Sequence, residues 1–132
     1  MTSDFAGRRI LVVEDEPMIT FLLEDALMIA GARAVVQAAR VAEALSAIST
    51  AMAEGGIDAA VIDYNLADGQ SALPVADRLA ELGVPFVFAT GYEPSVVNKG
   101  QHLEAPVIAK PYKPEDVLAS LAGIMGRISA SP

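Results

Sequence analysis

Short apolar runs alternate with segments of helical spacing along the whole of this 132-residue chain, and this alternation constrains the fold most strongly. The first run, residues 10–13, is apolar at every position, which is typical of a strand buried on both faces of a parallel sheet. The pattern predicts an α/β domain with a doubly wound, five-stranded parallel sheet. The expected strands are 9–14, 34–37, 57–63, 84–90 and 106–109, and the expected helices are 17–30, 41–54, 71–82, 93–100 and 114–125.

Reactive side chains stand at the ends of four of the expected strands. In a doubly wound sheet, ligands bind outside the carboxyl ends of the strands, at the point where the strand order switches. We therefore expect these side chains to converge on one pocket. They are Glu14 and Asp15 after the first strand, Asp63 at the end of the third, Thr90 at the end of the fourth and Lys110 after the fifth.

The carboxylates of this set predict a metal site. Carboxylates that lie close together repel one another unless a cation neutralises them. Hard oxygen ligands with open positions suit Mg²⁺, which keeps several waters and accepts phosphate oxygens. The alternative for Glu14 and Asp15 is that they merely cap the following helix, as acidic residues near a helix start often do. A third carboxylate, Asp63, at a second strand end favours the metal site.

The other side chains suit phosphoryl chemistry, although each has a simpler alternative. Asp63 is a candidate nucleophile that would form an acyl phosphate, or it starts the turn 65–69. The Thr90 hydroxyl could donate to a phosphoryl oxygen, or Thr90 is only a good strand former. Lys110 is a point charge for a phosphate, and a cis bond to Pro111 would turn it inward.

Composition excludes several classes of function. The formal net charge of −8, from 17 acidic and 9 basic residues, argues against nucleic acid or an anionic membrane as a partner. The chain has no cysteine for thiolate chemistry, and its single histidine, His102, rules out a site that needs two imidazoles. Residues 1–7 lack a signal-peptide stretch, and no run approaches the ~20 apolar residues of a membrane span. We expect a cytoplasmic protein.

Over residues 8–128 the chain resembles bacterial response-regulator receiver domains. The acidic pair after the first strand, the acceptor Asp, the strand-four Thr and the Lys-Pro pair carry the resemblance. The string Phe-Ala-Thr-Gly-Tyr at 88–92 is similar to a stand-alone subgroup of that family. The resemblance implies a flavodoxin-like (βα)5 fold with strand order 2-1-3-4-5. Residues 1–7 would be an N-terminal extension and residues 129–132 a short tail.

The resemblance also assigns roles to the strand-end residues. Asp63 would be the phosphorylated residue. Mg²⁺ would be bound by Glu14, Asp15, Asp63 and the backbone carbonyl of Asn65. Thr90 and Lys110 would contact the new phosphate. Such a protein is not an enzyme in the usual sense, but a phosphoacceptor that assists its own phosphorylation and slow dephosphorylation.

The chain departs from the family pattern at the acceptor loop and at the switch. The loop 63–69 lacks the usual Met-Pro and is shorter to its Gly. Val107 occupies the place of the family's switch aromatic on strand five. Tyr92 could replace that aromatic or could be an ordinary loop residue. The expected switch set is therefore Thr90, Tyr92, Val107 and Pro111.

Taken together, these features predict a single-domain response regulator of a two-component phosphorelay. A sensor histidine kinase would phosphorylate Asp63 with Mg²⁺ bound, and a conformational change would signal to another protein, which could be a His-containing phosphotransfer protein. The first alternative is a receiver-like interaction module that works without phosphorylation. A flavodoxin-like cofactor binder and a metal-dependent phosphatase are weaker alternatives. The kinase, the signal, the output partner, the oligomeric state and the choice between phosphate sink and relay stay open.

Overall fold

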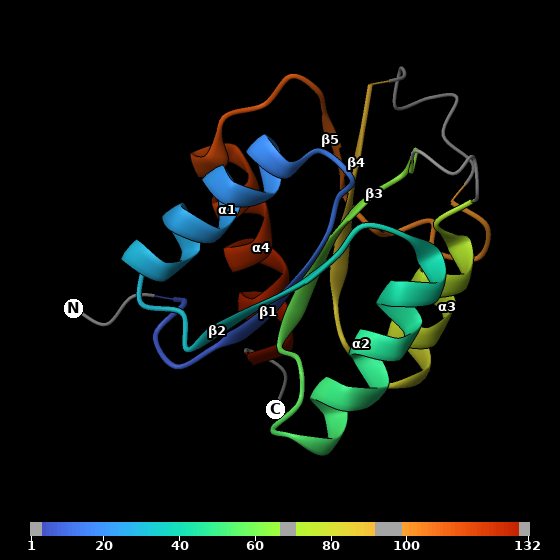
Figure 1. Cartoon of the computed structure of the whole chain (residues 1–132), viewed down its shortest axis with the longest axis horizontal. Helices are drawn as coiled ribbons and strands as arrows, with labels where there is room; N and C mark the ends of the chain where they lie inside the picture. Colours follow the sequence, from blue (N-terminus) through green and yellow to red (C-terminus); the bar gives the residue numbers. More distant parts are fainter. Residues whose placement is uncertain (1–3, 67–70, 92–98, 130–132) are drawn as a thin grey trace.

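A computed structural model describes residues 4–66, 71–91 and 99–129, with side chains described up to Gly126. Five parallel strands form one sheet in the order β2-β1-β3-β4-β5 (Figure 1), which confirms the predicted doubly wound α/β fold. The apolar runs form these strands because both faces of a parallel sheet are covered. The strands are β1 (Arg9–Val13), β2 (Ala34–Ala38), β3 (Ala59–Asp63), β4 (Phe86–Thr90) and β5 (Val107–Ala109).

Four helices cover the sheet within the described residues. Helices α1 and α4 lie on one face, and α2 and α3 lie on the other (Figure 1). None of these helices has the length and apolarity needed to cross a lipid bilayer. Their bounds are α1 (Pro17–Ile29), α2 (Val41–Ala53), α3 (Leu73–Glu81) and α4 (Pro114–Ser129).

Helix α4 and the N-terminal segment differ from the expectation. Helix α4 continues through Gly126 to Ser129 instead of ending at Met125. A glycine at an exposed helix position costs only ~1 kcal/mol, so it does not by itself end a helix whose other face is buried. Phe5 lies in the core with 5% of its surface exposed, so the predicted N-terminal extension contributes to packing. The helix expected at 93–100 falls largely in 92–98, outside the described residues.

Two hydrophobic cores sandwich the sheet. One contains buried side chains of α2 and α3 together with Leu11, Ile62 and Phe88 of the strands. The other contains buried side chains of α1 and α4 with Val12 and Val61, which point to the opposite face. The alternation of side chains along a strand explains how neighbours such as Leu11 and Val12 enter different cores. Both cores therefore anchor the central strands, whose C-terminal ends carry the reactive side chains.

The topology brings those strand ends together. The chain leaves β1 for β2 on one side and returns to β3 on the other, so the C-terminal ends of β1 and β3 are neighbours. Strand β4 pairs with β3, and β5 pairs with β4. The ends of β1, β3, β4 and β5 therefore meet along the upper edge of the sheet in Figure 1. This is the place where doubly wound folds bind ligands.

A pair of isoleucine substitutions tests the cores. Ile48 of α2 is fully buried, whereas Ile29 of α1 is 79% exposed. We expect Ile48→Ala to lower the free energy of unfolding by about 2–5 kcal/mol, because it leaves a cavity. The matched Ile29→Ala should change it by less than ~0.5 kcal/mol. Urea unfolding followed by circular dichroism measures both, and equal losses would contradict this packing.

Candidate functional site

Three carboxylates meet at the C-terminal edge of the sheet. Glu14 follows β1 and is 5% exposed, Asp63 ends β3 and is 3% exposed, and Asp15 is half-buried. One carboxylate oxygen from each lies within 4.8 Å of those from the other two. The predicted convergence of these residues is therefore present. Oxygen atoms at this spacing fit the ligand set of a small divalent cation.

The ammonium group of Lys110 bridges two of these carboxylates. Its Nζ lies 3.0 Å from Glu14 Oε1 and 3.1 Å from Asp63 Oδ2. The Lys110 side chain is 18% exposed, so these contacts are shielded from solvent. The Lys110–Pro111 bond is cis. Strand-end position alone indicated a charge for a phosphate, but it did not indicate the ion pair with Glu14.

Backbone N–H groups hold both carboxylates in place. Glu14 Oε2 accepts hydrogen bonds from the N–H of Asp15 at 2.9 Å and of Glu16 at 3.2 Å. Asp63 Oδ1 accepts one from the N–H of Asn65 at 3.0 Å. Among the described residues no side chain caps the first turn of α1, so the capping alternative for the acidic pair is not realised. The second oxygen of Asp63 faces Lys110, and most of the expected turn 65–69 lies outside the described residues.

Thr90 is joined by its side chain to the loop that follows Asp63. Its Oγ1 donates to Asn65 Oδ1 at 3.2 Å, and its backbone carbonyl accepts from the N–H of Lys110 at 2.7 Å. Thr90 is fully buried at the end of β4. The contact with the Asn65 side chain had no signal in the sequence, because Asn65 stood out only through its backbone carbonyl. It ties the strand-four hydroxyl to the loop that follows Asp63.

Burial and the surplus of carboxylates over ammonium groups shift the pKa values of Glu14, Lys110 and Tyr112. Burial, followed by the hydrogen bond with Asp63, raises the pKa of Glu14 to about 7, although Lys110 pulls it down. Burial alone would lower the pKa of Lys110, but its bonds to Glu14 and Asp63 outweigh burial and raise it. Burial and then the charge of Glu14 raise the pKa of Tyr112 to about 12. One ammonium does not fully compensate these carboxylates, so the site favours a further cation.

The predicted switch residues are only partly placed. Val107 is half-buried, pairs with Phe88 across β5 and β4, and packs against the core that faces α2 and α3. Tyr92 lies outside the described residues, so its replacement of the family's aromatic stays a prediction. Pro111 is exposed beside Lys110.

A doubly wound sheet with an acidic cluster, a lysine and a threonine at its C-terminal edge is the arrangement of a receiver domain. No protein-family model matches the chain. The BeF3-activated solution structure of SdrG from Pseudomonas melonis Fr1 is 40% identical and has a TM-score of 0.72, and the match covers 91% of this chain and 98% of SdrG. The chain belongs to the response-regulator receiver family.

Two longer proteins are also similar. The phyllosphere-induced regulator PhyR of Methylorubrum extorquens is 35% identical over 114 residues, which are 86% of this chain and 42% of PhyR. A mutant of the anti-anti-sigma factor PhyR from Bartonella quintana is 21% identical with a TM-score of 0.79, over 98% of this chain and 53% of that one. The second likeness shows the fold alone. The chain spans about half the length of these PhyR proteins.

The raised pKa of Glu14 predicts a pH dependence of stability in metal-free buffer. Between about pH 4.5 and 7 the folded protein holds a proton on Glu14 that the unfolded chain has lost. The contribution of Glu14 to the free energy of unfolding therefore falls as pH rises through this window, by an amount on the order of 3 kcal/mol.

Glu14→Gln should remove this contribution, because glutamine keeps the shape of the side chain but does not titrate. The matched change Glu54→Gln, on an exposed residue at the end of α2, should keep the wild-type slope. Urea unfolding with a chelator present, repeated from pH 4.5 to 7.5, measures the slopes. Identical slopes for wild type and Glu14→Gln would contradict the pKa assignment.

Proposed function

We propose that the protein is a phosphorelay response regulator that accepts a phosphoryl group on Asp63 from a sensor histidine kinase, with Mg²⁺ bound. The observation that carries this proposal is the contact of Lys110 with Asp63 inside a cluster of three carboxylates. The aspartate oxygen is thus held beside a positive charge and beside oxygen ligands for a metal. Phosphoryl transfer needs chiefly such positioning and charge neutralisation.

Asp63 acts in this proposal as the nucleophile. Its carboxylate oxygen forms a bond to phosphorus while the bond from phosphorus to the kinase histidine nitrogen breaks. The imidazole leaves with the electron pair of that bond and ends neutral, carrying one proton. Lys110 stays beside the Asp63 carboxyl and stabilises the charge on the transferred group. Glu14, Asp15, Asp63 and the Asn65 carbonyl would hold Mg²⁺, which would supply further charge neutralisation when bound.

The phosphoryl group adds about two negative charges beside Thr90. The hydroxyl of Thr90, which donates to Asn65 in this structure, can then donate to a phosphoryl oxygen instead. The exchange breaks the side-chain bond between Asn65 and Thr90 and gives the protein two distinct states. Beryllofluoride stands in for a phosphoryl group on aspartate. The BeF3-activated conformation of SdrG, which is 40% identical, therefore supports the proposal that the protein has two states.

The remaining parts of the proposal concern partners. The donor is a cytoplasmic kinase domain that carries phosphohistidine, and the output goes to another protein through the changed surface. A His-containing phosphotransfer protein can be that acceptor. Among the described residues no histidine lies in the acidic site, which suits a phosphoacceptor with slow self-hydrolysis better than a phosphatase.

Phosphoryl labelling tests the acceptor. With Mg²⁺ and either a phosphorylated kinase or acetyl phosphate, we expect wild type to take up the label and Asp63→Asn to take up none, because the amide is a poor nucleophile. The matched change Asp25→Asn, on an exposed residue of α1, should leave labelling unchanged. Label that persists in Asp63→Asn would refute the acceptor. A wild-type chain that takes no label would instead support an interaction module that works without phosphorylation.

Mg²⁺ binding should depend on pH. Because Glu14 has a pKa of about 7, it must release its proton when it coordinates the metal. We expect the apparent Mg²⁺ affinity to fall about tenfold per pH unit below 7. Isothermal titration calorimetry at several pH values measures this, and Asp15→Asn should weaken binding at every pH. An affinity that does not change from pH 5.5 to 8 would count against Glu14 as a ligand.

A further inference from the structure

Four aromatic rings contact one another edge to face on the α2–α3 side of the sheet. The centroids of Tyr64 and Phe88 are 6.0 Å apart at 86°. Phe88 and Phe86 are 5.5 Å apart at 74°, and Phe86 and His102 are 5.2 Å apart at 80°. Edge-to-face pairs at these distances are attractive and depend on orientation. We refer to Tyr64, Phe88, Phe86 and His102 as the aromatic series.

The first member of the series is attached to the acceptor loop. Tyr64 lies between Asp63 and Asn65, and its backbone N–H donates to the carbonyl of Ala89 at 2.8 Å. The neighbouring Asn65 side chain accepts from Thr90. The ring that contacts Phe88 therefore belongs to a residue whose two neighbours, Asp63 and Asn65, both form part of the acidic site.

The last member lies at the other end of β4. The His102 side chain is 8% exposed, and its Nε2 is 2.6 Å from Oδ1 of Asp77 on α3. The Lys99 ammonium bonds to two carbonyl oxygens of the same turn, at 2.8 and 3.1 Å. These contacts make residues 99–105 a closed turn that His102 joins both to α3 and to Phe86.

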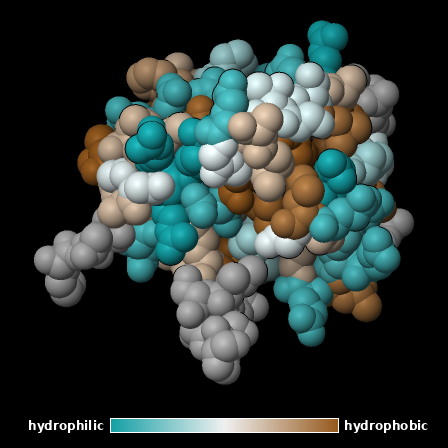
Figure 2. Space-filling view, turned by 90° about the horizontal axis from the view of Figure 1, so that it is seen from below, coloured by the Kyte–Doolittle hydropathy of each residue, from teal (hydrophilic) through white to brown (hydrophobic). Residues whose placement is uncertain are grey.

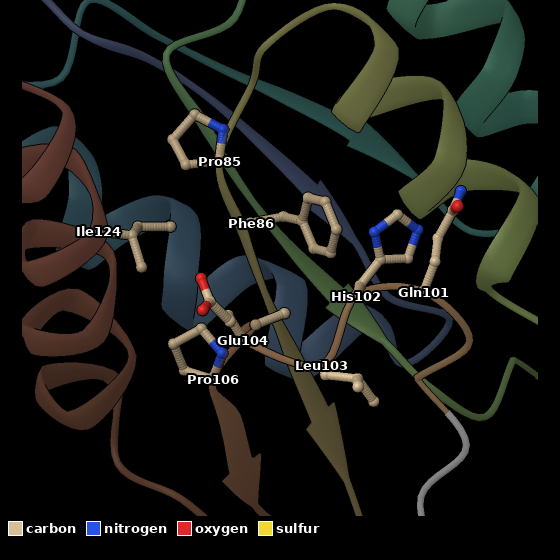
Figure 3. A pocket seen from close by; sticks show the side chains of 9 residues that line it. Pro85, Phe86, Gln101, His102, Leu103, Glu104, Pro106 and Ile124 are labelled. Atoms are coloured by element: carbon tan, nitrogen blue, oxygen red, sulfur yellow. The ribbon is translucent and has the colours of Figure 1, made fainter.

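This turn borders a surface hollow of about 420 Å³ at the N-terminal edge of β4 and β5. In Figure 2, which looks onto that edge, apolar atoms gather in a hollow right of centre. Figure 3 shows the rings of Phe86 and His102 beside one another at its border, where they meet edge to face. The hollow is also lined by Pro85, Pro106 and Ile124, with Leu103 and Glu104 on the turn. A movement of the two rings therefore alters the shape of this surface.

At this level of the sheet the chain has an aromatic side chain on β4, Phe88, whereas its family usually has one on strand five. Val107 pairs with Phe88, so both side chains point to the same face of the sheet. Valine is stiff and has no ring that could swing between two positions. Phe88 is fully buried and contacts a ring on each side, Tyr64 toward the acceptor and Phe86 toward the opposite edge.

We propose that the aromatic series couples the acceptor site to the turn 99–105, so that occupation of Asp63 shifts the Phe86–His102–Asp77 contacts and the hollow beside them. The proposal rests on the proposed phosphorylation of Asp63. A close-packed interior transmits a ring displacement, because neighbouring side chains have no free space to absorb it. Phe86 and Thr90 are four residues apart on β4, which spans about 13 Å, so His102 does not touch the phosphate.

The single histidine of the chain provides the readout. The ring carbon-bound proton signals of His102 can be followed by NMR at constant pH while beryllofluoride and Mg²⁺ are added, and fluorine NMR reports binding at the acceptor. We expect these signals to shift on binding in wild type and not to shift in Asp63→Asn. No binding would contradict the proposed function and the coupling together. Binding without a shift would contradict the coupling alone.

Ring variants test the route. Tyr64→Leu and Phe86→Leu should still bind beryllofluoride but lose most of the His102 shift, whereas Tyr64→Phe, which keeps the ring, should retain it. Phe5→Leu removes a buried ring from the opposite core and should also retain the shift, which controls for general loosening. A full shift in Phe86→Leu would overturn the route, because it would mean that the signal reaches His102 without the series.

Discussion

The ammonium group of Lys110 lies between two nearly buried carboxylates, and the arrangement of the strand ends depends on this contact. Carboxylates removed from water cost several kcal/mol each unless a charge or hydrogen bonds compensate them. Lys110 meets both Glu14 and Asp63 at about 3 Å, and backbone N–H groups occupy their other oxygens. The ends of β1, β3 and β5 are thereby held together by polar contacts, although the cores of the sheet are apolar.

Even with this contact, the single positive charge of Lys110 faces more than one carboxylate. A third carboxylate, Asp15, lies within reach of the other two. Burial is the main cause of the raised pKa of Glu14, and the neighbouring carboxylates raise it further. Binding of a divalent cation at a site of this kind is favourable, and it displaces the proton from Glu14. The carboxylates that cost stability are therefore the same groups that would attract a metal ion.

Two connections lead away from the loop that follows Asp63, in different directions. The Asn65–Thr90 hydrogen bond joins the loop to the C-terminal end of β4, and Tyr64 joins it to the rings that run back along the same strand. Both connections from the loop therefore lead to strand β4: one to Thr90 at its end and one to Phe88 within it. The position of Val107 fits this arrangement, because the family's strand-five aromatic would lie beside Phe88, where this chain already carries a large ring.

The pattern of apolar runs was sufficient to predict the sheet. The residues at the ends of those runs were sufficient to predict where the site lies. Glu14, Asp63 and Lys110 could be predicted because parallel strands bring their carboxyl ends to one edge. The continuation of α4 through Gly126 could not be predicted, because a glycine stops a helix only where packing does not hold it. The burial of Phe5 was likewise invisible before the second core was known.

What the sequence by itself determined is the order of elements, their burial and the chemical types gathered at one edge, because these follow from local periodicity and from the geometry of parallel sheets. Only the tertiary structure decided which groups touch. The Lys110–Asp63 and Asn65–Thr90 bonds join residues 47 and 25 positions apart, and the four-ring series joins Phe86 to His102, 16 positions along the chain. Such pairs depend on side-chain directions and distances that arise only when the strands are packed against their helices.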